Sequence, residues 1–141
     1  MNFTEKEKEL ALQLKQKGLK WKPEEGDWFW VMEEVSHHFY LGENLPASYF
    51  FQRGGVFLFD SSMIWHLQHG GLNISSFVWL PSWNFCREVL RNKEYLLELH
   101  DLKDGIFLRV SKKDEQYEQS ALTDLEAVYS ILLKLFLSNF L

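Results

Sequence analysis

The chain has 141 residues, of which 46% are hydrophobic and 25% are charged, and its formal net charge is −5. This length and composition are typical of one folded domain and exclude a disordered or fibrous protein. Proteins that hold nucleic acid through its phosphates need clustered Lys and Arg, and the basic residues of this chain are scattered along it. We therefore expect no nucleic-acid partner.

The N-terminal sequence and the cysteine content bear on the compartment. The start, MNFTEKEKE, has no basic segment followed by an apolar run, so a secretion signal is not expected. Cys86 is the one cysteine of the chain, so no internal disulfide can form. We expect a cytoplasmic protein.

The first helix is predicted to begin at Thr4 and to end at Gly18. Thr4 and Glu7 have the T-x-x-E spacing of a capping box, in which each side chain bonds a free amide of the first turn. Glycine at position 18 can adopt the left-handed conformation that ends a helix, and Leu19 can then pack back on Leu14. Lys and Glu cover most of this helix, which predicts that it lies on the outside of the fold.

Strands are predicted in the rest of the first half. Residues 28–35 favour a strand by their Trp, Phe and Val content. Residues 49–52 and 56–60 are also strand-like, and the Arg-Gly-Gly sequence at 53–55 between them predicts a tight hairpin. Residues 61–71 fit a short helical turn or an irregular loop, and we predict a loop.

The second half is predicted to begin with a strand over residues 74–80. Pro81 and Ser82 then open a helix with a buried apolar face. Two further strands flank Asp104 and Gly105, residue types that mark a second hairpin.

A polar loop is predicted at residues 111–119, before the last helix. Thr123 and Glu126 repeat the capping-box spacing and open that helix. It is apolar on nearly every side, so it is either central to the fold or shared with another chain. Because it contains Glu126 and Lys134 and falls short of the roughly 20 apolar residues that cross a bilayer, we expect a buried helix and no membrane contact.

The order of these elements indicates the fold class. A helix, several strands, a helix, two strands and a helix, joined by short hairpins without βαβ spacing, predict an α+β fold. We expect an antiparallel sheet covered by the N-terminal, middle and C-terminal helices, and one domain over residues 1–141.

The second half also has a recognisable layout. Trp79-Leu80-Pro81-Ser82 opens the middle helix, a hairpin follows, and the last helix begins near Ala121-Leu122. This layout resembles the small phage and prophage domains described as α/β/α sandwiches. The resemblance implies an accessory protein of a phage or mobile element and assigns no chemistry.

Histidines offer one candidate chemical site. His66 and His69 are three residues apart and Asp60 lies shortly before them, so the three could hold zinc or ferrous iron. His37 and His38 are adjacent, and neighbours in a strand point to opposite faces, so at most one of them could join a common site. These spacings match no strong metal template, which favours surface histidines and no bound cofactor.

Cys86 is a second chemical candidate. A thiolate near a helix N-terminus is acidified and can act as a nucleophile. Its place on the apolar face of the middle helix instead favours a small core residue.

Aromatic residues are the remaining candidates for a contact surface. The chain has six Trp, and between residues 35 and 90 only five side chains are charged: Glu43, Arg53, Asp60, Arg87 and Glu88. Exposed Trp residues are typical anchors of protein interfaces. The proposed binding residues are Trp28, Trp30, Trp65, Trp79 and Trp83, and core packing is the alternative explanation for them.

Together these observations favour a non-catalytic protein-binding or assembly domain of phage or mobile-element type. Its partner would be another protein or a second copy of itself, as in a homodimer. The alternative is a small metal-dependent enzyme that uses His66, His69 and Asp60. A third hypothesis, single-stranded nucleic acid stacking on the Trp residues, lacks the basic groove that such binding needs.

Overall fold

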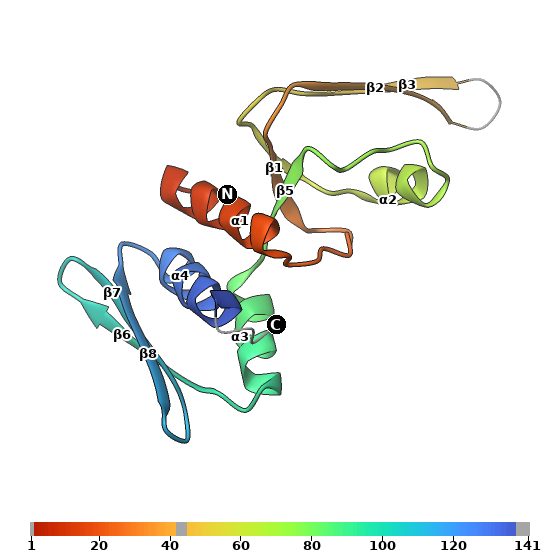
Figure 1. Cartoon of the computed structure of the whole chain (residues 1–141). Coiled ribbons are helices and arrows are strands. Elements are labelled where there is room, and N and C mark those ends of the chain that lie inside the picture. The colour runs from red at the N-terminus through yellow and green to blue at the C-terminus, as the bar shows by residue number, and fades with distance from the viewer. Residues whose placement is uncertain (1, 42–44, 138–141) are drawn as a thin grey trace. The chain divides into compact units, whose positions relative to one another are not determined.

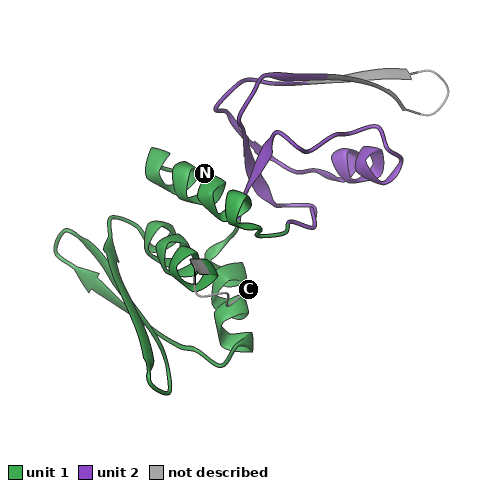
Figure 2. Cartoon of the chain, viewed as in Figure 1, with its two compact units in different colours: residues 1–20, 81–141 green, residues 21–80 purple. Residues whose placement is uncertain are grey.

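The computed structural model describes residues 2–41 and 45–137, and it describes side chains outside 37–49 and up to 136. The chain forms two compact units, residues 1–20 with 81–141 (unit 1) and residues 21–80 (unit 2), which Figure 2 shows in different colours. Each unit has its own strands and helices, so we describe them separately. The prediction of one domain stays a prediction.

Unit 2 is built on a three-stranded antiparallel sheet in the order β4-β1-β5 (Figure 1). Its strands are β1 (Trp28–Val31), β4 (Val56–Leu58) and β5 (Phe77–Leu80). Phe29 is fully buried and stacks on Phe77 with 4.5 Å between ring centroids. Around this pair the buried core contains Val31, Phe51, Phe59, Met63 and Leu72. The aromatic content of the first half therefore supplies a core of its own.

A two-stranded antiparallel ribbon follows, made of β2 (Val35–Leu41) and β3 (Leu45–Phe51). The predicted Arg-Gly-Gly turn exists: Gly54 has a φ of 79° and the Gly55 amide donates to the Gln52 carbonyl oxygen. The predicted hairpin across it is wrong, because β3 pairs with β2 and β4 pairs with β1. Turn chemistry indicates where the chain reverses but leaves the pairing partners undetermined.

Residues 61–71 were expected to be a loop, and the structure places a helix there instead, α2 (Ser61–Gln68). Asp60 caps it, since one carboxylate oxygen accepts a hydrogen bond from the Met63 amide at 2.8 Å. Met63 is buried in the core of unit 2, and Ile64 and Leu67 pack against that core. The helix is eight residues long, so packing of this face stabilises it more than helix propensity does.

Unit 1 contains three helices and three strands among its described residues. The helices are α1 (Glu5–Lys17), α3 (Trp83–Asn92) and α4 (Asp124–Leu137). The strands are β6 (Leu96–Leu102), β7 (Gly105–Lys112) and β8 (Glu115–Ala121), and they form an antiparallel sheet in that order. Helix α4 packs against β7, β8, α1 and α3. The buried Leu108 and Val110 of β7 supply the centre of the sheet's inner face.

Both ends of α1 form as predicted. Thr4 and Glu7 make the reciprocal bonds of a capping box, at 2.8 and 2.9 Å. Gly18 is left-handed, and the Gly18 and Leu19 amides donate to the carbonyl oxygens of Lys15 and Leu14, which is the Schellman pattern. Local sequence therefore determines this helix almost completely.

The β6–β7 hairpin at Asp104-Gly105 is confirmed, with Leu102 opposite Gly105. The loop predicted at residues 111–119 is wrong, because β7 continues to Lys112 and β8 begins at Glu115. This segment is polar because one of its faces is solvated, and half-solvated strands alternate polar with less polar residues.

Helices α1 and α4 are joined at their N-termini by a buried polar contact. The Thr123 hydroxyl lies 2.6 Å from one oxygen of Glu7 and 3.1 Å from one oxygen of Glu126. Thr123 also accepts a bond from the Glu126 amide, which confirms the predicted cap of α4. A buried carboxylate needs hydrogen-bond donors, and the Thr123 hydroxyl supplies one to Glu7, so the start of α4 helps to stabilise the capping box of α1.

The apolar residues of α4 are mostly buried in unit 1 itself, namely Leu125, Ala127, Val128, Tyr129, Ile131, Leu132 and Leu135. Among the described residues no helix is long and apolar enough to cross a membrane. Of the two predicted explanations for an apolar last helix, a central place in the fold accounts for these residues.

The predicted α+β class is confirmed. The described residues form four helices and three antiparallel sheets. The strands divide over three sheets, and α2 is added to the three predicted helices.

Candidate functional site

The five tryptophans predicted as a binding surface do not share one face. Trp28 and Trp30 are half-buried on one side of β1, whereas Trp79 lies opposite Phe29 on the other side of that sheet. Trp79 stacks on Trp21 with an interplanar angle of 9°. Trp83 belongs to unit 1, where it is the first residue of α3 and half-buried. A tryptophan surface stays a prediction.

Trp65, on α2, is the most exposed member of that set, with 46% of its surface accessible. It stacks on His69 at 4.0 Å between centroids, and the His69 Nδ1 atom lies 2.8 Å from the Trp65 carbonyl oxygen. This pair is a small exposed patch on a short helix.

The predicted metal ligands have separate surroundings. Asp60 caps α2, His66 is buried, and His69 is exposed against Trp65. In the part of the chain that the structure describes, no group of three or more His, Cys, Asp or Glu residues could hold a metal ion. The metal centre and any activity based on it stay predictions. The side chains of His37 and His38 lie outside the part of the chain that the structure describes.

Cys86 is fully buried on α3, as its position on an apolar face indicated. Burial raises the pKa of its thiol, and the carboxylate of Asp124 adds to this effect. A buried, protonated thiol is a poor nucleophile, so the site favours a packing role.

One strand of unit 1 has an unusual surface. Large hydrophobic side chains that are exposed in the described residues are Phe50, Leu58, Trp65, Leu96, Leu99, Leu102 and Leu122. Three of these seven lie on β6, with exposed fractions of 73% for Leu96, 43% for Leu99 and 50% for Leu102. Because β6 is an edge strand, half of its backbone amides and carbonyls also point away from β7.

Leu99 is exposed because α4 packs on β7 and β8, farther along the sheet. Leu99 lies opposite Leu108 in the register, so both residues are on the inner face of the sheet. Leu108 is fully buried, whereas Leu99 lies at the margin of the region that the helix covers. An apolar strip therefore continues past the helix to the open edge.

The outer face of the same sheet has a charged cluster centred on Arg109. The guanidinium of Arg109 lies 3.5 Å from Glu98 of β6 and 3.4 Å from Glu118 of β8. Glu98 also lies 3.6 Å from the Nε2 atom of His100. All of these groups are substantially exposed, so the ion pairs contribute little to stability, and they give the β6 edge a charge pattern.

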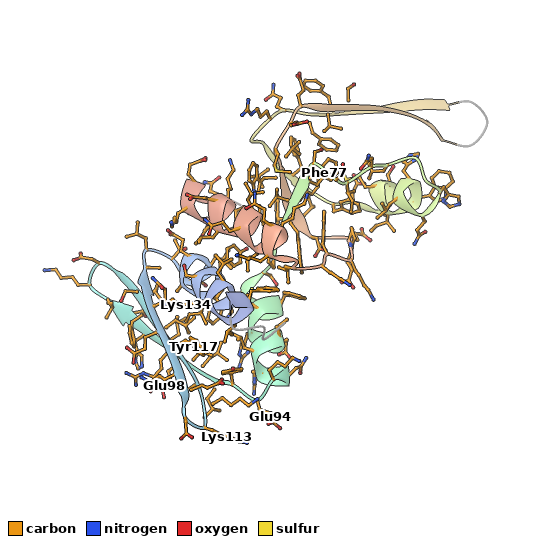
Figure 3. The ribbon with its side chains drawn as sticks, viewed as in Figure 1. Phe77, Glu94, Glu98, Lys113, Tyr117 and Lys134 are labelled. Carbon is orange, nitrogen blue, oxygen red and sulfur yellow. The ribbon has the colours of Figure 1, made fainter. Side chains whose placement is uncertain are left out.

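The opposite edge, β8, is protected. Helix α4 packs on it, and the Nζ atom of Lys134 donates to the Glu118 carbonyl oxygen at 2.9 Å. Figure 3 labels Lys134, Glu98 and Tyr117, which come from α4, β6 and β8 respectively. A lysine at a strand edge is a usual device against unwanted pairing. Of the two edge strands of the sheet, β8 therefore has α4 and Lys134 beside it, whereas β6 has exposed leucines.

A shallow hollow of about 470 Å³ adjoins the end of β6. Gly105 is one of its lining residues, and a Cβ atom there would collide with the Ala121 carbonyl oxygen. Its lining consists of Leu102, Lys103, Asp104, Gly105, Ser120, Ala121 and Leu122. Of the three exposed leucines of β6, Leu102 lines this hollow.

The sequence predicts β6 as a strand, but none of the predicted site residues lies on it. The signal was present in Leu-Leu-Glu-Leu-His-Asp-Leu, whose leucines occupy both faces of a strand that directly follows a helix. A strand with one buried face shows clean alternation, so leucines on both faces indicate either complete burial or an uncovered edge. The register and the position of α4 decide between these two.

No family model, curated protein or solved structure matches the chain. The resemblance of the second half to phage domains accordingly stays a prediction.

Proposed function

We propose that this chain is a non-catalytic protein-binding domain that accepts an added β-strand along the open edge of β6. The observation that carries the proposal is the combination, on β6, of a backbone edge that pairs with no other strand of the described residues and the exposed Leu96, Leu99 and Leu102.

Strand addition uses both parts of this surface. The main-chain groups of the edge supply hydrogen bonds to any extended segment, and alternate side chains supply selectivity. Soluble proteins usually blunt such edges with Lys, Pro, a bulge or a covering element. Strand β6 has neither Lys nor Pro, and of its two acidic residues Glu98 lies on the outer face and Asp101 on the inner face. A partner that covers the leucines would remove apolar surface from water as well as completing the ladder.

Site-specific photocrosslinking in cells would test the proposal. Benzoylphenylalanine would replace Leu99 on β6 or, as the matched control, Gln119 on β8, since both residues lie next to Leu108 on the inner face. We expect adducts of defined mass from position 99 and none from position 119. Equal labelling at both positions, or no adduct from position 99, would contradict a binding role for this edge.

A further inference from the structure

We propose that the strand added to β6 is the β6 strand of a second copy of this chain, paired antiparallel about a two-fold axis at Leu99. This inference rests on the proposed function and names its partner. The evidence is a self-complementary order of side chains along the exposed edge.

Pairing β6 with itself about Leu99 sets leucine opposite leucine and glutamate opposite histidine. Leu96 faces Leu102 of the second copy, and Leu99 faces its own counterpart. Glu98 faces His100, which forms an ion pair when the imidazole is protonated and a hydrogen bond when it is neutral. Cross-strand pairs of these kinds stabilise antiparallel sheets.

The remaining pair of this register sets Leu97 against Asp101. Leu97 is half-buried and Asp101 is exposed, so the carboxylate can stay in water beside the leucine. The pair of Leu97 and Asp101 therefore neither favours nor opposes the register centred on Leu99.

Neighbouring registers are less favourable. Moving the axis one residue toward the N-terminus places Glu98 against Glu98 of the second copy. Moving it one residue toward the C-terminus places His100 against His100 and Glu98 against Leu102. Like charges directly opposite each other are destabilising, so the charge order selects the register centred on Leu99.

The same axis places the inner faces of both sheets on one side of the combined sheet. A two-fold axis perpendicular to the sheet keeps the α4 side of both copies on one side of a six-stranded sheet. The exposed Leu99 side chains then meet at the axis, beyond the region of each sheet that α4 covers. On the outer face the Glu98 and His100 side chains, 3.6 Å apart within one copy, combine into an alternating cluster of four. The arrangement buries the apolar margin of both copies and leaves no open β6 edge.

Sedimentation equilibrium of the full chain over a range of concentrations is the first test. We expect a monomer–dimer equilibrium for the wild type and a dissociation constant raised about tenfold or more by Leu99→Lys, which sets two lysines against each other at the axis. The matched control Gln119→Lys should leave the constant within about twofold, because residues far from an interface contribute little to its affinity. Circular dichroism confirms that both variants are folded.

Exchanging the charges at positions 98 and 100 tests the register. This test does not depend on the exposed leucines of the proposed interface. Glu98→Lys and Glu118→Lys each remove one ion pair with Arg109, but only the first changes the proposed interface. We expect weakened dimerisation from Glu98→Lys alone. Adding His100→Glu should restore dimerisation, since the introduced lysine of each copy then faces the introduced glutamate of the other. Equal effects of the two single variants, or no recovery in the double variant, would overturn this register.

The outcomes separate the two proposals. A strictly monomeric protein that still yields adducts of another mass from position 99 would overturn self-pairing and leave strand addition by a different protein. A monomer without adducts would overturn both. A dimer that Leu99→Lys and Glu98→Lys leave unchanged would place the interface elsewhere and contradict the inference.

Discussion

The two edges of the sheet in unit 1 differ in how they are covered. Strand β8 lies against α4, and Lys134 bonds one of its carbonyl groups. Strand β6 has the same length but lies outside the main contact of α4, and it exposes three leucines. Both strands pair with β7 along seven positions. The difference shows that edge protection comes from what packs beside a strand as much as from the ladder itself.

Shortening the side chains at two opposed positions of the inner face tests the difference between the covered and the exposed part of the sheet. Leu108→Ala removes a fully buried side chain from β7, and we expect it to lower the free energy of unfolding by about 2–5 kcal/mol. Leu99→Ala, directly opposite, should cost less than about 1 kcal/mol in dilute protein because the side chain is already 43% exposed. Urea denaturation measures both. Similar losses would mean that the β6 edge is covered in solution.

The next largest effect concerns the helix that protects β8. Thr123→Ala removes the cap of α4 and the hydroxyl between Glu7 and Glu126, so we expect a loss of about 1–2 kcal/mol. Hydrogen exchange should show faster exchange in β8 and at the start of α4, with β6 less affected. Thr123→Ser is the matched control, since it retains the hydroxyl.

A smaller effect is expected from removing the hydrogen bond that joins Tyr95, next to β6, to the other edge strand, β8. The Tyr95 hydroxyl, just before β6, donates to Glu115 at the start of β8 at 2.6 Å. Tyr95→Phe should lower the free energy of unfolding by about 1 kcal/mol at neutral pH.

This effect has a defined pH dependence. Burial and then the bond to Glu115 raise the pKa of Tyr95 to about 12. The folded protein therefore holds this proton more tightly than the unfolded chain, whose tyrosine pKa is about 10. The stabilisation is complete below pH of about 10, falls as pH rises toward 12, and is absent above it. Denaturation of wild type and variant at both ends of this window measures it, and a constant difference would contradict the bond.

The bond between Lys134 and β8 is expected to contribute least to stability. Lys134→Ala should change the free energy of unfolding by less than about 1 kcal/mol, because the lysine is exposed. It should nevertheless speed hydrogen exchange in β8 near Glu118, whose carbonyl loses its partner. Lys113→Ala, in the β7–β8 turn, is the control and should leave that region unchanged.

Several elements could be predicted because their determinants lie within a few residues. Thr4, Ser82 and Thr123 cap α1, α3 and α4 by accepting bonds from amides three residues away. The end of α1 and the β6–β7 hairpin depend on the positive φ of Gly18 and Gly105. Helix α2 was missed although Asp60 caps it, because an eight-residue helix depends on packing Met63 into a core that the sequence does not display. Strand β8 was missed because its polar face carries no hydrophobic pattern.

The candidate site was less predictable than the fold. Tryptophans and histidines attract attention because of what they do in other proteins, yet the tryptophans of unit 2 lie on different elements and faces. The leucines of β6 look like ordinary core residues, and only their exposure gives them another meaning.

Local bonding and backbone conformation determine the starts of α1, α3 and α4, the end of α1 and the turns at residues 53–55 and 104–105, and the order of the elements indicates the α+β class. Only the tertiary structure shows which strands pair and which edge exposes leucines. Pairing depends on contacts between residues far apart in the chain, and exposure depends on where α4 stops covering the sheet.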